Sequence, residues 1–364
     1  MRHRLLSALL LVTVVVSSLG AGVGAGVAGA ADAQTTCKFP VTKTDATGAK
    51  VTINEAPKRI VTLSPSAAQT MWKIGGKDKV VGVSKYSAYL DGASEKTNVS
   101  GAGMTAVVPE KVVSLNPDLV LAPNIISDET VKKLRNAGLT VYKFREAKSI
   151  DDIYAKTNLT GKLTGECGGA KETVSWMKDR IETVHQAVEG EDSPSVMYVM
   201  SGGYTAGNGT FMDTIITQAG GTNVAAEAGI SGYQPISNEV VVEQKPQWFI
   251  VSTGAKIPDA YSSTPAAKKN QTVSLNPNYV SQPAPQIVKP IAKLAKTLHP
   301  KAYQKANVTT TTEQTMTSAD SGSRTTTTTA DSATSTSESG GQPGFGVPIA
   351  VVALGLVGLL TRRF

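Results

Sequence analysis

The pattern of hydrophobic and polar residues between about residues 57 and 300 alternates between short apolar runs and longer amphipathic stretches. The short runs have the length of buried strands, and the stretches between them have helical spacing. The helix signal is clear after Ser127, which can cap the first turn, and Gly138 ends it. Strands that alternate with helices predict a largely parallel sheet covered by helices. In this first half, strands are expected at residues 59–63, 80–83, 119–122 and 141–144.

The second half of this region repeats the plan, with strands expected at residues 196–200 and 248–251. The two halves also share letters. Pro117 follows Glu110, and Pro246 follows Glu239, at the same interval, with valines between and an apolar strand after. Each copy predicts a short helix that stops before its proline. The repetition predicts two pseudo-symmetric lobes.

One amphipathic stretch joins the halves. A helix over residues 170–189 would span about 30 Å, the width of a small lobe, and would act as a stiff hinge. The expected fold is therefore α/β, with two pseudo-symmetric lobes, each on a parallel-type sheet, joined by one long α-helix. The apolar positions recur at near-heptad spacing, at Val174, Met177, Ile181, Val184 and Val188.

The two ends of the chain have the composition of targeting segments. Arg2 and Arg4 precede an apolar run and then a small-residue stretch, the layout of a secretory signal. Near the other end, a Thr- and Ser-rich segment that cannot bury a core precedes Pro343-Gly344-Phe345 and an apolar stretch, 347–360. This tail is either processed or an ordinary single membrane span, and both place the globular part outside the cell. The expected divisions are a signal peptide (1–33), an N-terminal extension (34–56), an N-terminal lobe (57–148), a helical connector (149–190), a C-terminal lobe (191–300), a Thr/Ser-rich stalk (301–342) and a sorting signal (343–364).

Cysteine usage fits an exported protein. The chain has two cysteines, Cys37 and Cys167, and in an oxidising location such a pair suggests one disulfide. Two free, buried thiols are the alternative. Sequons that permit surface glycosylation begin at Asn98, Asn158, Asn208, Asn270 and Asn307.

Charge and motif content exclude several classes of function. The two ends of the chain contribute part of the net charge of +7, and the lysines are scattered. No basic stripe is interleaved with aromatics, which argues against nucleic acid binding. The three histidines, His3, His185 and His299, are too dispersed to form a cluster that holds a transition metal. Neither a Gly-x-Ser-x-Gly elbow nor a phosphate-binding Gly-x-x-x-x-Gly-Lys loop occurs in the sequence. We therefore expect neither an enzyme nor a metal site.

Five segments stand out by their order and spacing: residues 59–66 (RIVTLSPS), 80–86 (VVGVSKY), 115–122 (LNPDLVLA), 219–223 (AGGTN) and 281–285 (SQPAP). With them, roughly residues 57–300 resemble the helix-linked class (class III) of periplasmic-binding proteins, which serve ABC importers of cobalamin and ferric siderophores. The tail, with its Pro343-Gly344-Phe345, resembles the archaeal PGF-CTERM sorting signal. That resemblance implies removal of the hydrophobic end by an archaeosortase-type enzyme and lipid attachment at the cell surface.

The resemblance implies a solute held between the lobes by loops at the carboxyl ends of the strands. Tyrosine in such loops offers a flat apolar face and a hydroxyl, which suits a large ring with polar edges; for each tyrosine, a half-buried structural role is the alternative. The positive charge there is chiefly Lys85 and Arg145, which favours a corrinoid such as cobalamin over an anionic ferric siderophore; haem and a ferric hydroxamate remain alternatives. The expected contacts are Ser66, Tyr86, Tyr89, Asn124, Arg145, Tyr204 and Tyr233.

In the same family a glutamate on each lobe docks onto arginines of a dimeric membrane permease. The repeated motif carries this role to Glu110 and Glu239. The alternative is a solvated glutamate at a helix start, stabilised by the helix dipole. The protein is expected to be a monomer that binds a solute and a permease; a structural surface protein is the competing class.

Overall fold

The computed structural model describes residues 36–103 and 105–306 of the chain. The expected signal peptide, nearly all of the stalk, the C-terminal sorting signal and the sequon at Asn307 lie outside the described residues. Within the described ranges, no helix combines the length and the apolar character that crossing a membrane requires.

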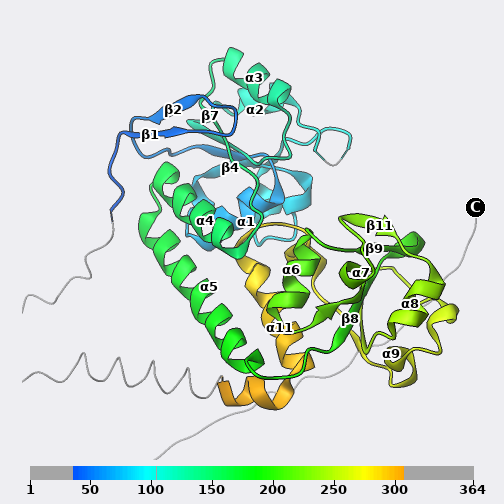
Figure 1. Ribbon diagram of the computed structural model, residues 1–364. Helices are drawn as coiled ribbons and strands as arrows, with labels where there is room; N and C mark the ends of the chain where they lie inside the picture. Colours follow the sequence, from blue (N-terminus) through cyan, green and yellow to red (C-terminus); the bar gives the residue numbers. More distant parts are fainter. Residues whose placement is uncertain (1–35, 104, 307–364) are drawn as a thin grey trace, which may run out of the picture. The chain divides into compact units, whose positions relative to one another are not determined.

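The N-terminal lobe is built on a parallel sheet with the strand order β5-β4-β3-β6-β7 (Figure 1). Because side chains alternate across a strand, Ile60 and Leu119 face the core under α1, whereas Val61 and Val120 face the core under α2 and α3. Helices thus cover both faces, as the apolar runs predict. The elements are β3 (Ile60–Thr62), α1 (Pro65–Lys73), η1 (Lys77–Lys79), β4 (Val80–Val83), η2 (Lys85–Ser87), η3 (Ala93–Glu95), β5 (Thr97–Asn98), α2 (Pro109–Ser114), β6 (Leu119–Ala122), α3 (Asp128–Asn136) and β7 (Val141–Lys143).

The N-terminal extension forms a hairpin, β1 (Val41–Thr44) and β2 (Lys50–Ile53), that packs on this lobe. Asp45, in its turn, accepts from Arg135 at 2.6 Å and from the backbone N–H of Lys143 at 3.0 Å. Burial raises the pKa of the Asp45 carboxyl, but hydrogen bonds from the Thr47 hydroxyl, the Lys143 N–H and Arg135 outweigh it and hold that pKa below its usual value. The extension is therefore part of the folded lobe.

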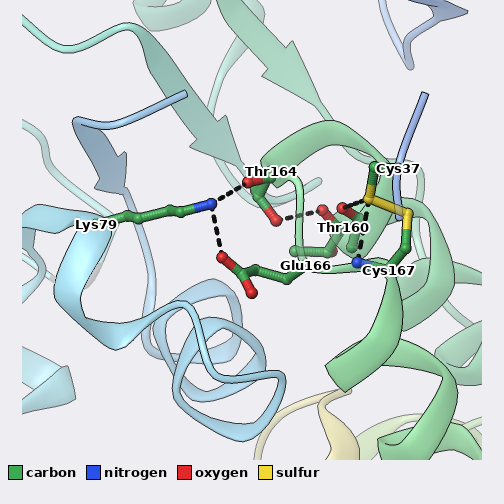
Figure 2. The surroundings of a disulfide bond; sticks show 7 residues. Cys37, Lys79, Thr160, Thr164, Glu166 and Cys167 are labelled. Carbon is green, nitrogen blue, oxygen red and sulfur yellow. Dashed lines mark hydrogen bonds and ion pairs between the residues drawn. A yellow bond between two sulfur atoms is a disulfide. The ribbon is translucent and has the colours of Figure 1, made fainter. Parts of the chain in front are cut away.

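A disulfide joins Cys37 to Cys167, with an S–S distance of 2.01 Å (Figure 2). This is the pairing expected from the sequence. It ties the start of the extension to the first residue of α5. Beside it, Lys79 forms an ion pair with Glu166 at 2.6 Å and donates to the Thr164 carbonyl at 2.8 Å. The first turn of α5 is thus fixed to the N-terminal lobe.

The connector consists of two antiparallel helices, α4 (Ile150–Thr164) and α5 (Cys167–Val188). α5 is the continuous helix that the heptad-like spacing predicts. α4 begins with a capping box, in which Ser149 and Asp152 bond to each other's backbone N–H. A Cβ on Gly161 would lie 2.4 Å from the Ala170 methyl, so glycine permits the close approach of the two helices.

The C-terminal lobe has the parallel strand order β10-β8-β12-β13, which matches β4-β3-β6-β7 of the first lobe. An antiparallel ribbon, β9 with β11, lies outside this sheet. The elements are β8 (Ser195–Val199), η4 (Ser201–Gly203), β9 (Tyr204–Ala206), α6 (Phe211–Gln218), β10 (Thr222–Asn223), α7 (Val224–Glu227), β11 (Tyr233–Pro235), α8 (Asn238–Gln244), β12 (Trp248–Val251), η5 (Asp259–Tyr261), α9 (Pro265–Lys268), β13 (Thr272–Val273), α10 (Pro277–Val280), η6 (Pro285–Ile287) and α11 (Val288–Leu298).

The folded lobe continues beyond residue 300, where the sequence led us to begin the stalk. Residues 300–306 are helical, and Tyr303 and Ala306 are buried in the core that also contains α5 and α11. The boundary drawn from composition is therefore too early, because the first residues after Pro300 still contribute apolar side chains to the core.

Candidate functional site

The segments that follow the strands of the N-terminal lobe place Ser66, Tyr86, Asn124 and Arg145 at the carboxyl edge of its sheet. Tyr86, after β4, has an exposed ring, and Lys85 lies over it with its Nζ 5.1 Å from the ring centroid. Asn124, after β6, is half-buried, and Arg145, after β7, is exposed. Ser66 is different, because it is buried and its hydroxyl lies 3.0 Å from that of Ser64. Ser66 thus shapes the start of α1 and presents no free side chain.

Tyr89 makes a contact between the two lobes. Its hydroxyl accepts from the Nε2 of Gln69 at 2.8 Å and from the Nε2 of Gln282 at 2.9 Å. Its ring meets Tyr279 edge-on, with centroids 6.5 Å apart. Burial raises the pKa of Tyr89, so it stays protonated. These contacts use the side chain structurally, which is the alternative left open by the sequence.

On the C-terminal lobe, Tyr204 and Tyr233 lie on the ribbon formed by β9 and β11. Tyr204 pairs with Pro235, two residues along from Tyr233, so both tyrosines project from the same face of the ribbon. Their side chains are 45% and 51% exposed, which is unusual for rings of this size. The ribbon therefore presents two neighbouring aromatic side chains to solvent.

Two further residues of this group were not expected from the sequence. Tyr198, on β8, lies close enough to Tyr233 that burial and this second hydroxyl together raise its pKa, while a hydrogen bond with Ser252 lowers it. Thr205, the middle residue of β9, donates to the Tyr198 carbonyl at 2.8 Å. The sequence did not identify Tyr198 as a site residue, because it occupies one position of an apolar run that predicts a buried strand. Its place near the end of β8 is the signal that could have found it.

The backbone before the ribbon requires glycine. Gly202 and Gly203 both have positive φ, 73° and 75°, which lets the chain turn directly from β8 into β9. Directly after β9, a Cβ on Gly207 would lie 2.0 Å from the Ile230 carbonyl oxygen. These glycines thus set the backbone path that positions Tyr204 at the start of β9.

Two hollows elsewhere on the described protein do not involve the predicted ligand residues. A cavity of about 700 Å³ lies between the start of α4, the middle of α5 and the end of α6, and contains Tyr154, His185 and Gln218. A second, of about 470 Å³, lies beside the disulfide. The His185 Nε2 is 3.0 Å from the Gln218 Oε1, and the His299 Nε2 is 3.3 Å from the Gly220 carbonyl. Both described histidines are thus engaged away from the strand-end loops.

The repeated glutamates occupy equivalent places. Glu110 and Glu239 are each the second residue of a short helix, α2 and α8, and both are exposed. Six residues later each chain turns through a left-handed residue, Asn116 (φ 43°) and Lys245 (φ 50°). The segments that begin at Glu110 and Glu239 are therefore similar in backbone conformation as well as in amino-acid sequence.

The residue after each proline fastens the motif to the first strand of its sheet. Asp118 accepts from the backbone N–H groups of Lys58 and Arg59, both at 2.8 Å. Gln247 accepts from the backbone N–H of Ser195, also at 2.8 Å. Each glutamate thus precedes, by the same number of residues, a side chain that is bonded to the start of the first strand of its sheet.

Comparison with known proteins agrees with this architecture. Residues 60–284 match the periplasmic binding protein family. A cobalamin-binding protein of Halobacterium salinarum is 44% identical over 347 residues, 92% of this chain and 91% of that protein.

Solved structures share the fold. A periplasmic haem-binding protein of Roseiflexus sp. RS-1 superposes with a TM-score of 0.60 at 24% identity, covering 67% of this chain and 99% of that one. The periplasmic vitamin B12 binding protein of Vibrio cholerae gives a TM-score of 0.58 at 22% identity, over 69% and 98% of the two chains. All of these relatives are binding proteins, and none is an enzyme. The chain, with its two parallel α/β lobes and its helical connector, belongs to the periplasmic binding protein family.

Proposed function

We propose that this chain is the substrate-binding protein of an ABC importer and that it captures a corrinoid of the cobalamin type. The observation that carries the proposal is the 44% identity to a cobalamin-binding protein, which extends over 92% of the chain and so includes both lobes and the connector. The protein would perform no chemistry on the solute. It would hold the solute until the permease accepts it.

The candidate contacts support a large, nearly neutral ring as the ligand. Tyr86 on one lobe and Tyr204 and Tyr233 on the other offer exposed aromatic faces with a hydroxyl at the edge. A corrinoid carries peripheral amides that can exchange hydrogen bonds with such hydroxyls and with the Asn124 side chain. Arg145 adds one positive charge at the same edge. We assign direct contact to these five residues; Ser66 and Tyr89 act through the loops and helices they fix.

Haem is the second candidate, and the three exposed tyrosines are the observation that favours it, because a tyrosine phenolate can ligate haem iron. Partial burial raises the pKa of Tyr233, which opposes formation of the phenolate. Both described histidines lie away from these loops. A corrinoid supplies its own axial base and needs no protein ligand, so we place it first.

Titration of the purified protein separates these ligands. Cobalamin, haemin and ferric siderophores are added in turn while tryptophan emission, melting temperature and the visible spectrum of the ligand are followed. Binding to the native state raises the melting temperature by mass action. We expect cobalamin to quench the tryptophan emission and to raise the melting temperature of the protein. The visible spectrum of cobalamin should stay unchanged, because no protein side chain replaces its axial base. No response to cobalamin, together with a tyrosinate-type spectrum for haemin, would reverse the assignment.

We also propose that Glu110 and Glu239 dock onto arginines of the permease, one on each side of its two-fold axis. Twin carboxylates at equivalent helix positions suit twin guanidinium groups, because carboxylate–arginine pairs are strong and directional. The double variant Glu110→Arg/Glu239→Arg should bind solute normally but fail to support uptake. Glu243→Arg, on the exposed surface of the same helix as Glu239, is the matched control and should transport normally. Normal uptake by the double variant would refute docking.

We infer that the protein is exported and tethered to the outer surface of the cell membrane. This location is supported by the signal-like N-terminus, the Thr-rich segment, the Pro-Gly-Phe tail and a disulfide of a kind that persists in oxidising compartments. The sequon residues Asn98, Asn158, Asn208 and Asn270 are all exposed, so glycans could be attached to the folded protein. Mass spectrometry of protein from its native membrane tests this. It should show a new N-terminus near residue 33 and no peptide after the Pro-Gly-Phe; an intact C-terminus would exclude tail removal by an archaeosortase.

A further inference from the structure

The disulfide between Cys37 and Cys167 lies at a hollow in the protein surface. The hollow has a volume of about 470 Å³, and both cysteines line it. It forms where the N-terminal extension meets the end of α4 and the start of α5. Each cysteine is half-buried, so the fold does not seal the sulfur atoms off from solvent. A small molecule that enters this hollow would therefore lie beside the S–S bond.

The charged side chains that line the hollow are all positive. They are Lys38 of the extension, Lys43 of β1 and Lys162 in the last turn of α4. All three are exposed, and none forms an ion pair within 4.0 Å with any carboxylate of the described residues. Glu166, next to Cys167 in the chain, is already paired with Lys79 at 2.6 Å. The hollow thus has an uncompensated positive charge, which raises the local concentration of anions.

The start of α5 adds to this positive potential. Cys167 is the first residue of this 22-residue helix, and its backbone N–H donates to the Cys37 Sγ at 3.1 Å (Figure 2). A helix N-terminus and nearby lysines both stabilise a thiolate. A negative charge that develops on the Cys37 Sγ would therefore meet a hydrogen-bond donor already in place. This makes the Cys37 sulfur a good leaving group when the disulfide is attacked.

We propose that this disulfide is a site of thiol–disulfide exchange with a small anionic thiol, a molecule that carries both a thiol and carboxylates. The thiolate of that molecule attacks the Cys167 Sγ and forms a new S–S bond with it. The bond between Cys167 and Cys37 breaks, and its electron pair remains on the Cys37 Sγ as a thiolate. One disulfide is replaced by another, so the incoming thiol is the only co-reactant. The exchange releases the N-terminal extension from the first turn of α5.

The three lysines select the charge of the incoming thiol. Carboxylates on the thiol are attracted into the hollow, whereas an ammonium group is repelled. A neutral thiol should react at an intermediate rate. The selection rests on the charges around the disulfide and does not depend on which solute the protein transports.

The test compares three thiols on the full-length protein with its disulfide intact: glutathione, which has a net negative charge, neutral 2-mercaptoethanol and positively charged cysteamine. Each is supplied at equal thiolate concentration and low ionic strength, and its rate is divided by its rate with a neutral small-molecule disulfide. Acid quenching, alkylation and mass spectrometry measure the adduct. We expect glutathione to react about tenfold faster than cysteamine. The difference should nearly vanish in about 1 M sodium chloride, where the Debye length is about 3 Å. The first adduct should be on Cys167.

Two variants with the same change in net charge separate the hollow from the protein as a whole. Lys38→Gln/Lys43→Gln/Lys162→Gln should lose the preference for glutathione. Lys178→Gln/Lys268→Gln/Lys269→Gln, which removes exposed lysines of α5 and the end of α9, is the matched control and should keep it.

Three results would overturn the proposal. The first is equal normalised rates for the three thiols, or an equal loss of preference in both variants. The second is a first adduct on Cys37, which would exclude Cys37 as the leaving group. The third is a disulfide that reacts with no thiol until the protein is unfolded, because the hollow would then give no access to the sulfur atoms.

Discussion

Single side chains of the candidate site are exposed in a way that favours ligand contact. Tyr204 and Tyr233 leave about half of their surface in water, on one face of a two-stranded ribbon. An aromatic ring gains when a guest covers it, through removal of apolar surface from water and through stacking. These two residues are therefore the most direct means of testing where the solute lies.

Tyr233→Ala and Tyr204→Ala should each weaken binding of the solute about tenfold, which corresponds to roughly 1.4 kcal/mol. The corresponding phenylalanine variants should keep most of the affinity if the ring face carries the contact. Calorimetric titration with cobalamin measures both. Tyr154→Ala serves as the control, because Tyr154 lines the separate cavity between α4 and α5. An unchanged affinity in both alanine variants would remove the ribbon from the site.

Lys156 is a charged residue in a buried environment. It is buried on α4, and burial lowers its pKa to about 8. Its Nζ donates to the Pro283 carbonyl at 3.3 Å and lies 5.7 Å from the Phe144 ring centroid. Between pH 8 and the ordinary pKa of lysine, the unfolded chain holds more protons than the folded one. The free energy of unfolding should therefore rise with pH across this window. Below about pH 8 Lys156 is charged in both states, and the full cost of burying its charge lowers the stability of the folded protein.

Lys156→Met should raise the free energy of unfolding at pH 7 by about 1–2 kcal/mol. The burial penalty on the charge is about 3 kcal/mol by the size of the pKa shift, and the lost hydrogen bond offsets about 1 kcal/mol. The variant should also lose the rise in stability above pH 8. Urea unfolding at pH 7 and pH 9.5 measures both effects, with Lys162→Met, an exposed lysine of the same helix, as the control. A Lys156→Met protein less stable than the wild type at pH 7 would show that the charge is well compensated.

At the scale of elements, the paired turns after α2 and α8 carry a measurable strain. Asn116 and Lys245 both have positive φ, but asparagine adopts this conformation more readily than lysine. Lys245→Gly should stabilise the protein by about 0.5–1 kcal/mol, and Asn116→Gly should change it little. Lys111→Gly, in the interior of α2, should instead destabilise by about 1 kcal/mol. Denaturant unfolding gives all three values. If Lys245→Gly lowered stability, the turn would not be strained.

The disulfide fixes another pair of elements, the N-terminal extension and the first turn of α5. It closes a separation of 130 residues along the chain, and such a long loop loses much entropy in the unfolded state. Reduction should lower the free energy of unfolding by about 3–5 kcal/mol. The variant Cys37→Ser/Cys167→Ser should reproduce this loss and no longer respond to reductant. Identical melting of the wild type with and without reductant would contradict the expectation.

At the scale of the whole molecule, the Tyr89 hydroxyl joins the lobes, because it accepts from Gln69 of its own lobe and from Gln282 of the C-terminal lobe. Tyr89→Phe removes the acceptor that Gln69 and Gln282 share and leaves buried donors without it, which costs about 1–3 kcal/mol. We expect a lower melting temperature and faster hydrogen exchange in residues 278–286. Tyr86→Phe, which removes an exposed hydroxyl in the neighbouring loop, should change neither. Equal behaviour of the two variants would mean that the amides find other partners.

The sequence located most regular elements because their signals are local. Buried parallel strands are short apolar runs, and the capping residue Ser127 and the stopping Gly138 each act on the helix turn next to them. The ribbon of β9 and β11 was missed because its two strands are short and distant in the chain, and β11 is exposed throughout, so neither strand has an apolar period. The boundary between the C-terminal lobe and the stalk was placed too early, at residue 300, because it was drawn from composition. Burial of Tyr303 and Ala306 in the core shows that the lobe extends further.

The sequence by itself determined the two-lobed α/β plan, the long connecting helix, the repeated glutamate motif and the cysteine pair, since each follows from periodicity, spacing or residue type within one segment. Tertiary structure decided which of the predicted ligand residues are exposed, and that Tyr89 and Ser66 serve structural contacts. These outcomes depend on contacts between segments far apart in the chain, and burial and charge are properties of such contacts.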